Sequence, residues 1–230
     1  MDRPSVHPGD RSGHAPAPPD GDTPTRPRPG SAGEHVLQEA CGTQARADRF
    51  YAHQMSDRIN EAMREFIGRM EMAFIATADG HGECDTSFRA GPPGFVHVVD
   101  ERTIAWPEYR GNGVMASAGN IAENPHVGVL FLDFVRDLVG LHVNGSAELM
   151  APSDFDRRYL DDRVDVVPGR RPERWIVVTV EEAYIHCSKH IPRLQPVPRA
   201  RDWGTDDPAK KGGDHFGVGS QASRLDRTGT

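Results

Sequence analysis

The sequence predicts a mainly β domain whose strands form a closed or partly closed antiparallel barrel with a few flanking helices, α+β overall. Six or seven short runs of apolar, β-branched and aromatic residues fall between residues 50 and 195. Turn signals rich in glycine, proline and aspartate separate these runs, which is typical of strands that follow one another in a meander. Only a few stretches repeat apolar residues every three or four positions, as a helix would. Because closure leaves few unpaired strand edges, we expect a barrel.

The first predicted helix of this domain covers residues from about 56 to 70. Its apolar residues recur at steps of three and four and form one stripe of Met55, Ile59, Met63, Phe66, Ile67 and Met70. We expect this helix to cover an edge or an end of the sheet. Before it, the stretch from Glu34 to Phe50 is compatible with a weak helix and is ambiguous.

Seven runs predict the strands. They are rich in β-branched and aromatic residues or alternate apolar with polar residues, and turns such as Asp79-Gly80 and Asp100-Glu101-Arg102 separate them. Gly140 and Gly145 predict bends in the longest run. The predicted strands cover residues 72–78, 84–89, 95–99, 103–106, 126–134, 138–150 and 174–187.

Two further helices are predicted between these strands. One covers Asn112 to Asn124, and Pro125 ends it. Its helical spacing is that of Val114, Met115, Ala118, Ile121 and Ala122. The other is polar, opens at Pro152 and runs to about Asp162.

A single domain over residues 50–195 is predicted, with a tail on each side. Residues 1–33 hold eight prolines and five glycines but only two large apolar residues. Such a segment cannot bury enough surface to offset the entropy of ordering it. We therefore expect a disordered N-terminal tail over residues 1–49. The polar, glycine-containing residues 196–230 predict a flexible C-terminal tail.

Composition narrows the class of protein. The chain carries 27 basic and 34 acidic residues, a net charge of −7, which disfavours general binding to nucleic acid or to anionic membranes. The three cysteines are far apart and indicate no disulfide framework. The sequence shows no apolar signal core and no run long enough to span a bilayer. We expect a soluble, cytoplasmic protein.

Polar residues gather between the strand that ends at Trp106 and the start of the helix that follows it. Gly111 and Gly113 permit close approach of a ligand, and a helix start exposes unpaired N–H groups. The remaining polar groups here are those of Arg110, Asn112, Ser117 and Asn120. Together they could hold a phosphate, although helix capping and surface solvation would explain the same residues.

Ser87 and Arg89 lie two residues apart on a predicted strand, so their side chains share a face. A guanidinium beside a hydroxyl suits a phosphate or a flavin carbonyl. A surface salt bridge of Arg89 is the alternative.

The pair His186-Cys187 raises the question of a metal or of thiol catalysis. Adjacent strand residues point to opposite faces, so the two side chains cannot meet as a catalytic pair. A zinc site would need further ligands at recognisable spacing, and the sequence offers none. We expect neither a metal site nor a catalytic side chain.

Four segments, in their order and spacing, resemble the pyridoxamine 5′-phosphate oxidase-like family of FMN-binding split barrels. They are FIATADGHGECDTSFRAGPPGFVHVVDERTIAWPEYRGN, SAGNIAENPHVGVLFLDF, GLHVNG and VEEAYIHCSKHIPRL, between about Met55 and Arg193. The resemblance implies a six-stranded split β-barrel of Greek-key type. It also implies a homodimer that binds FMN at the subunit interface.

The resemblance carries cofactor contacts onto particular positions. The flavin-contacting strand of the family falls on Ser87, Phe88, Arg89 and Ala90, and the pair ending the next strand falls on Trp106 and Pro107. Asn112 falls at the position of an arginine of the family's phosphate clamp. Gly140 falls at the position of a glutamine that contacts the flavin, and His186 at that of a tryptophan that lies against the flavin. The implied phosphate and ribityl contacts are Arg89, Arg110, Asn112, Ser117 and Asn120, with Lys189 reaching the site from the last strand.

Departures from the family pattern concern the vitamin B6 substrate. Pro92 replaces the strand lysine that holds the substrate phosphate. Tyr159 and Arg163 keep their spacing, but Val167 replaces the serine expected next, and the C-terminal RxHxR-like element is absent. Each lost charge-assisted bond would cost about 1.5–3 kcal/mol. The chain therefore resembles the subgroup of predicted flavin-nucleotide-binding proteins rather than a true pyridoxamine phosphate oxidase.

The resemblance thus implies a flavin-binding protein, and an FMN-dependent oxidoreductase that acts on an unidentified small molecule is the leading hypothesis. Two alternatives stay open: a non-catalytic flavin-binding or redox-sensing module, and the same barrel with a deazaflavin cofactor or haem. For haem, His186 or His142 would be the axial ligand, although a lone histidine is more often satisfied within the core.

Overall fold

The computed structural model describes residues 28–159 and 169–219, and the chain forms two compact units, residues 1–47 and 48–230. The outer parts of both predicted tails lie outside the described residues, as do Arg163 and Val167. The division into one domain with two tails stays a prediction.

Two short helices lie near the start of the described chain. Ser31 caps α1 (Ala32–Ala40), because its Oγ accepts a hydrogen bond from the Glu34 backbone N–H at 3.2 Å. Gly42 follows with a φ of 63°, and α2 (Gln44–Gln54) begins after it. Both helices overlap the stretch from Glu34 to Phe50, where the sequence leaves a weak helix open.

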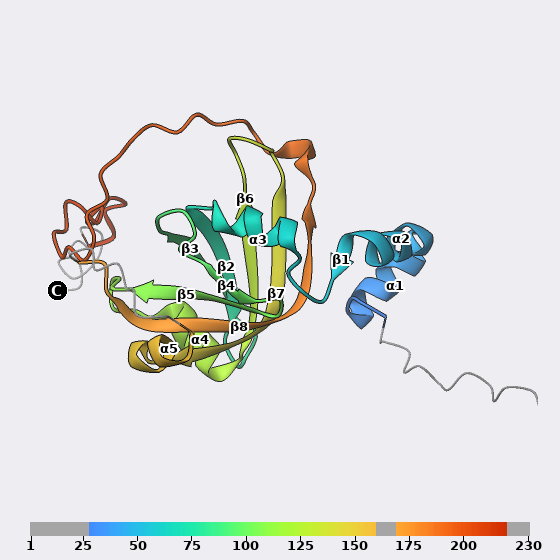
Figure 1. Cartoon of the computed structure of the whole chain (residues 1–230), viewed down its shortest axis with the longest axis horizontal. Coiled ribbons are helices and arrows are strands. Elements are labelled where there is room, and N and C mark those ends of the chain that lie inside the picture. The colour runs from blue at the N-terminus through green and yellow to red at the C-terminus, as the bar shows by residue number, and fades with distance from the viewer. Residues whose placement is uncertain (1–27, 160–168, 220–230) are drawn as a thin grey trace, which may run out of the picture. The chain divides into compact units, whose positions relative to one another are not determined.

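An antiparallel sheet of eight strands forms the second unit (Figure 1). Its hydrogen-bonded order is β3-β2-β6-β7-β8-β5-β4, and the two-residue β1 pairs separately with β8. The mainly β class with a few helices is confirmed, whereas the expected count of six strands is too low. The strands are β1 (Met55–Ser56), β2 (Met72–Ala78), β3 (Cys84–Ala90), β4 (His97–Asp100), β5 (Thr103–Tyr109), β6 (His126–Leu132), β7 (Gly140–Met150) and β8 (Pro172–His186).

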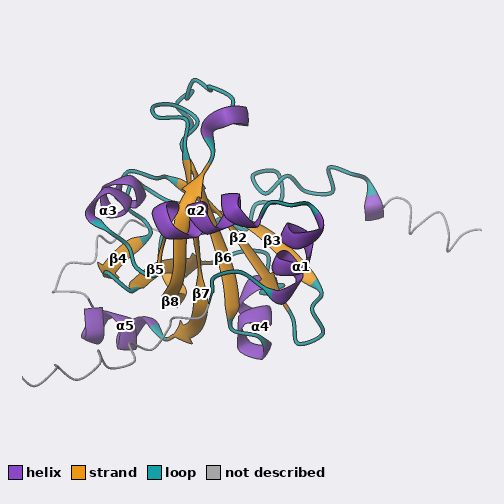
Figure 2. Cartoon of the chain, turned by 90° about the vertical axis from the view of Figure 1, so that its right-hand side faces the viewer, coloured by secondary structure: helices purple, strands orange, loops and turns teal. Residues whose placement is uncertain are grey.

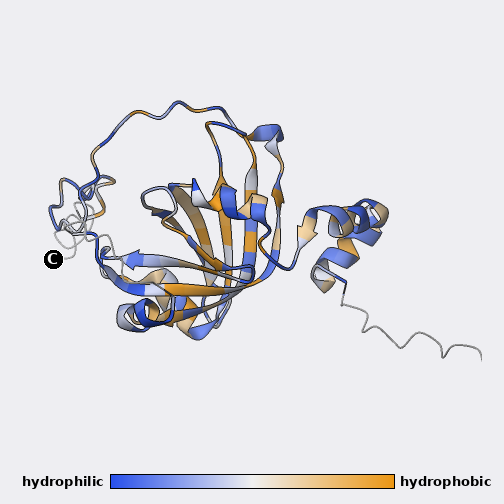
Figure 3. Cartoon of the chain, in the orientation of Figure 1, coloured by the Kyte–Doolittle hydropathy of each residue, from blue (hydrophilic) through white to orange (hydrophobic). Residues whose placement is uncertain are grey.

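The core lies on the inner face of this sheet. Along β2, for example, Ala73, Ile75 and Thr77 are buried, while the residues between them are half-buried or exposed. Figure 3 shows hydrophobic residues along the strands and mostly hydrophilic ones along the C-terminal segment. The largest fully buried side chains are Trp106, Phe131, Phe155, Ile67, Ile75, Ile104 and Ile176.

The longest strands, β7 and β8, bend together at a bulge between Asn144 and Gly145. A Cβ at Gly145 would lie 2.1 Å from the carbonyl oxygen of Thr179, so only glycine fits there. The bulge coincides with the bend predicted at Gly145. Strand β8 pairs with β7 along one edge and with β5 along the other.

The helices of this unit are shorter than the apolar spacing predicts. The helix predicted from residue 56 is α3 (Glu61–Gly68), because Asn60 caps it through a 2.9 Å bond to the Met63 N–H. The helix predicted from Asn112 is α4 (Ala116–Glu123). The third is α5 (Pro152–Tyr159), and its predicted end at Asp162 lies outside the described residues.

These helices lie at the two ends of the strands. Helix α3 lies toward one end, and α4 and α5 lie toward the other (Figures 1 and 2). After β8 and the short η1 (Ser188–His190), the chain runs back across this unit to the end of β5 (Figure 1). Within the described residues, no helix has both the length and the apolar character needed to cross a bilayer.

Candidate functional site

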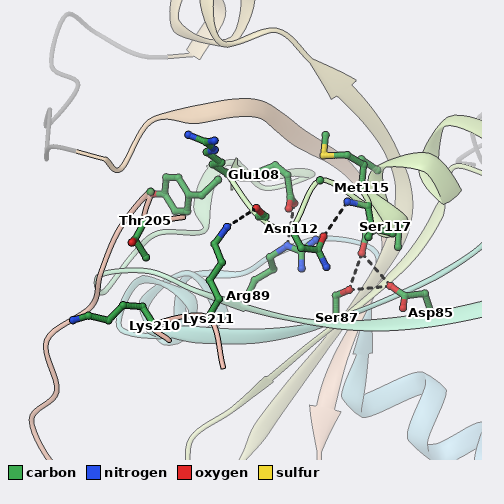
Figure 4. A pocket seen from close by; sticks show the side chains of 18 of the residues that line it. Asp85, Ser87, Arg89, Glu108, Asn112, Met115, Ser117, Thr205, Lys210 and Lys211 are labelled. Atoms are coloured by element: carbon green, nitrogen blue, oxygen red, sulfur yellow. Dashed lines mark hydrogen bonds and ion pairs between the residues drawn. The ribbon is translucent and has the colours of Figure 1, made fainter. Parts of the chain in front are cut away.

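A cleft of about 670 Å³ opens between β3, the end of β5 and the start of α4 (Figure 4). We call it the β3–α4 cleft. Loop 110–115 forms one wall, and the C-terminal segment forms another. The polar side chains that line it are those of Asp85, Ser87, Arg89, Glu108, Tyr109, Arg110, Asn112, Ser117, Asp202, Thr205, Lys210 and Lys211.

An ion pair closes the barrel beside this cleft. Strand β3 is first in the sheet order and β5 is last but one, so they do not pair through their backbones. Arg89 Nε on β3 instead lies 3.0 Å from Glu108 Oε2 on β5, and these side chains are only 20% and 15% exposed. Burial raises the pKa of Glu108 above its ordinary 4.5, an effect that the Arg89 charge opposes. The barrel is therefore closed by polar side chains at the place where β3 and β5 do not pair through their backbones.

A chain of hydroxyl groups joins α4 to β3. Ser117 is 4% exposed, and its Oγ donates to Ser87 Oγ at 3.0 Å or to Asp85 Oδ2 at 3.3 Å. Ser87 Oγ donates to the same Asp85 oxygen at 2.9 Å. Asp85, the neighbour of Ser87 on the same face of β3, thus joins the predicted site residues. Such hydroxyls and carboxylates suit a polyhydroxy ligand.

Loop 110–115 explains why α4 begins four residues later than predicted. Gly113 has a φ of 86° and Met115 a φ of 58°, and neither continues a right-handed helix. Asn112 turns the loop, because its Oδ1 accepts from the Val114 N–H at 3.0 Å. Met115 occupies the N-cap position and provides no side-chain hydrogen bond. The first N–H groups of α4 therefore remain available to an anion at the cleft.

The cations at the mouth of the cleft are paired with carboxylates of the C-terminal segment. Arg110 lies 2.5 Å from Asp206, and Lys211 lies 2.9 Å from the other oxygen of the same carboxylate. Lys210 pairs with Asp202 at 3.1 Å. The sequence predicts a flexible tail here, so Asp202, Asp206, Lys210 and Lys211 are not among the predicted site residues, although Trp203 and the adjacent lysines are signals in the sequence.

A sequence comparison identifies the family. The sequence model described as pyridoxamine 5′-phosphate oxidase matches residues 59–187, which are 129 of the 230 residues. The chain belongs to the pyridoxamine 5′-phosphate oxidase-like family. Its split-barrel fold is that of the family. Among curated proteins, no relative matches this chain.

Several solved structures are similar to this chain. HupZ of Group A Streptococcus is 23% identical, with 54% of this chain and 90% of that chain covered and a TM-score of 0.39. The conserved hypothetical protein Rv2991 of Mycobacterium tuberculosis is 16% identical, with 65% of this chain and 98% of that chain covered and a TM-score of 0.42. HutZ, the heme storage protein of Vibrio cholerae, is 14% identical, with 56% of this chain and 95% of that chain covered and a TM-score of 0.38.

The structure divides the positions carried over from the family into groups. Ser87, Arg89, Arg110, Asn112 and Ser117 meet in the β3–α4 cleft. The others lie outside its lining, and they are Phe88, Ala90, Trp106, Pro107, Asn120, Gly140, His186 and Lys189.

Five of these outlying residues lie on β3, β5 or α4, the elements that border the cleft. Phe88 and Ala90 point to the other face of β3 and line a second cleft that includes Pro92. Trp106 is 1% exposed and belongs to the hydrophobic core. Asn120 faces β2, where its Nδ2 donates to the buried Thr77 Oγ1 at 3.1 Å. Pro107, on β5, lies opposite Trp175 of β8.

Gly140 and His186 are paired with each other across β7 and β8. His186 Nδ1 lies 3.0 Å from His142 Nε2, and the His142 ring stacks on Tyr184 at 4.7 Å. Neither histidine lines the β3–α4 cleft.

Lys189 is exposed on η1, and Cys187 caps that turn by accepting from the Lys189 N–H at 3.4 Å. Among residues 28–159 and 169–219, no group of three or more histidine, cysteine, aspartate or glutamate side chains could hold a metal ion. The three cysteines are free and exposed.

Proposed function

We propose that this protein binds FMN in the β3–α4 cleft and acts as a cytoplasmic, FMN-dependent oxidoreductase on a small molecule. One observation supports the proposal most directly. Three elements, β3, β5 and α4, bring together the Arg89–Glu108 ion pair, the hydroxyl groups of Ser87 and Ser117, and a helix start without a side-chain cap. Family membership supports the same cofactor class. The cleft volume of about 670 Å³ lies within the usual range of about 300–1,000 Å³ for cofactor sites.

The residues present fit a phosphorylated, polyhydroxy cofactor. The N–H groups at the start of α4 and the Arg110 guanidinium suit the phosphate, because both present positive charge. Ser87, Ser117 and Asp85 offer hydroxyl and carboxylate partners for the ribityl chain. Arg89, held in place by Glu108, suits a flavin carbonyl.

FMN, when bound, supplies the electron and hydride transfer. The protein then needs no nucleophile, and its side chains bind and orient the cofactor and exclude water from it. The substitution by Pro92 favours a substrate other than pyridoxamine 5′-phosphate, because the position lacks a cation for a substrate phosphate.

We further propose a homodimer that shares the cofactor between subunits. The outer face of the sheet supports it, because apolar and aromatic side chains there are only half-buried: Phe74, Leu130, Leu132, His142 and Tyr184. Such a face is typical of an interface between copies. In a dimer, the region of Gly140, His186 and Lys189 of one subunit could complete the cleft of the other.

The absorption spectrum of the purified protein tests the proposal. We expect a yellow protein, or uptake of added FMN, and reduction of the bound flavin by a nicotinamide donor or by substrate. Bound FMN without turnover with any donor and acceptor would favour the redox-sensing module. A spectrum typical of a deazaflavin or of haem would identify that compound, instead of FMN, as the ligand. A colourless protein that takes up no FMN would contradict the proposal.

A further inference from the structure

The C-terminal segment around Trp203 is docked against the end of β5. The Trp203 ring meets Tyr109 edge to face at 5.2 Å between centroids, and the Arg170 guanidinium lies 5.9 Å from the Trp203 ring. The backbones of Gly169 and Gly204 touch, since a Cβ at Gly169 would lie 2.3 Å from the Trp203 carbonyl oxygen. An aromatic side chain held on several sides in this way fixes the segment in place.

A second contact holds the same segment on the other side of β3. Arg201 donates to the Gly91 carbonyl oxygen at 2.5 Å and pairs with Glu71 at 3.4 Å. The residues from Arg201 to Gly204 are therefore anchored both to the loop after β3 and to the end of β5. The end of β5 lines the β3–α4 cleft, and the loop follows the strand that forms its opposite side.

Beyond these anchors, the chain returns into the cleft. Thr205, Lys210 and Lys211 line it, and Figure 4 shows Lys211 pointing inward, toward loop 110–115. The Lys211 Nζ lies 3.5 Å from the Gly111 carbonyl oxygen. Its charge thus sits beside the loop that precedes α4.

The Asp206 carboxylate links the two cations at this point. One of its oxygens lies 2.5 Å from Arg110, and the other lies 2.9 Å from Lys211. The neighbouring cations lower the pKa of Asp206, with the hydrogen bond from Lys211 as the largest cause. A carboxylate bridging a guanidinium and an ammonium is the arrangement in which a phosphate would also be bound.

We propose that residues 201–211 complete the β3–α4 cleft, that Lys211 and Arg110 together bind the phosphate group of its ligand, and that Asp206 occupies these two cations when no phosphate does. Binding then exchanges one anion for another. The phosphate leaves Asp206 without its partners in an exposed position, where water solvates it at little cost. The identity of the ligand as FMN rests on the proposed function, whereas the phosphate chemistry rests on these contacts.

The exchange makes two opposite predictions that a purely structural role would not make. Lys211→Ala removes one charge-assisted hydrogen bond at an exposed site, so FMN binding should weaken about tenfold. Asp206→Asn removes the competing internal anion, so FMN binding should tighten about two- to fivefold. Riboflavin, which lacks the phosphate, should bind wild type and both variants equally.

Fluorescence titration of the full chain with FMN and with riboflavin measures these effects. Arg199→Ala is the matched control, because it removes a cation from the same exposed segment outside the β3–α4 cleft and should change neither affinity. Circular dichroism checks that all variants are folded. Equal FMN affinity of wild type, Lys211→Ala and Asp206→Asn would overturn the inference, as would parallel changes for riboflavin.

A wild-type protein that binds neither flavin would refute the proposed function but leave this inference testable. Inorganic phosphate is then the probe, followed by ³¹P NMR line broadening. Weaker broadening with Lys211→Ala and stronger broadening with Asp206→Asn, relative to Arg199→Ala, would support the inference. Identical titrations for all variants would overturn it.

Discussion

Replacing Arg89 by alanine tests whether the ion pair that closes the barrel also binds the ligand. The pair has a 3.0 Å separation and side-chain exposures of 20% for Arg89 and 15% for Glu108. Removal of one partner from a fully buried pair costs about 3–5 kcal/mol. Because some exposure remains here, we expect Arg89→Ala to lower the free energy of unfolding by about 2 kcal/mol at neutral pH.

This cost should depend on pH in a defined direction. Burial raises the pKa of Glu108 in the folded state above 4.5. A group with a raised folded-state pKa stabilises the fold when protonated, and that contribution is lost as pH rises through the folded pKa. Without the Arg89 charge, the folded-state pKa of Glu108 rises further. The stability of the variant therefore continues to fall up to a higher pH than that of wild type. The difference between wild type and Arg89→Ala should therefore shrink as the pH falls from neutral through the folded-state pKa of Glu108.

Urea unfolding and FMN titration of Arg89→Ala, Glu108→Gln and the double variant separate the two roles. We expect the double variant to regain most of the lost stability, because no unpaired carboxylate remains. Its FMN affinity should stay about 10- to 100-fold below wild type, as in Arg89→Ala. A double variant that binds FMN like wild type would show that Arg89 has no contact with the ligand. An equal stability cost in the Glu108→Gln background would refute the coupling itself.

Three further outcomes are expected. Ser117→Ala leaves Asp85 with one hydroxyl partner fewer and should lower the free energy of unfolding by about 1 kcal/mol and weaken FMN binding, in the same two assays. Leu130→Glu places a charge on the outer face and should turn a dimer into a monomer in sedimentation velocity; an unchanged mass would exclude this face as the interface. His142 should titrate below 6.5 in NMR, because burial and the nearby His186 both lower its pKa, so its contribution to stability is lost as pH falls.

Local sequence patterns predicted most of the barrel but not the exact helix starts. Apolar spacing alone cannot distinguish a helix from the turn before it, and side-chain caps and backbone angles decide that boundary. Asn60 caps α3, and the positive φ at Gly113 and Met115 delays α4. The two-residue β1 has no periodicity of its own, and only its pairing with β8 defines it.

The site was partly predictable for a similar reason. Ser87 and Arg89 share a strand face by simple alternation, so their joint position follows from sequence. Glu108 does not, because its importance arises from burial beside Arg89 across a split that no local pattern reveals. The C-terminal lysines were missed because a polar, glycine-containing segment resembles a tail even where one tryptophan docks it.

The charge balance of the β3–α4 cleft connects these points. Its lining cations, Arg89, Arg110, Lys210 and Lys211, each have a carboxylate partner in the described structure. An incoming anion therefore gains little from unpaired charge and must replace an existing partner. Glu108 is a poor candidate, because it is mostly buried and helps close the barrel, whereas the exposed Asp206 lies on the C-terminal segment. Affinity for a phosphate ligand should thus depend more on Asp206 than on Glu108.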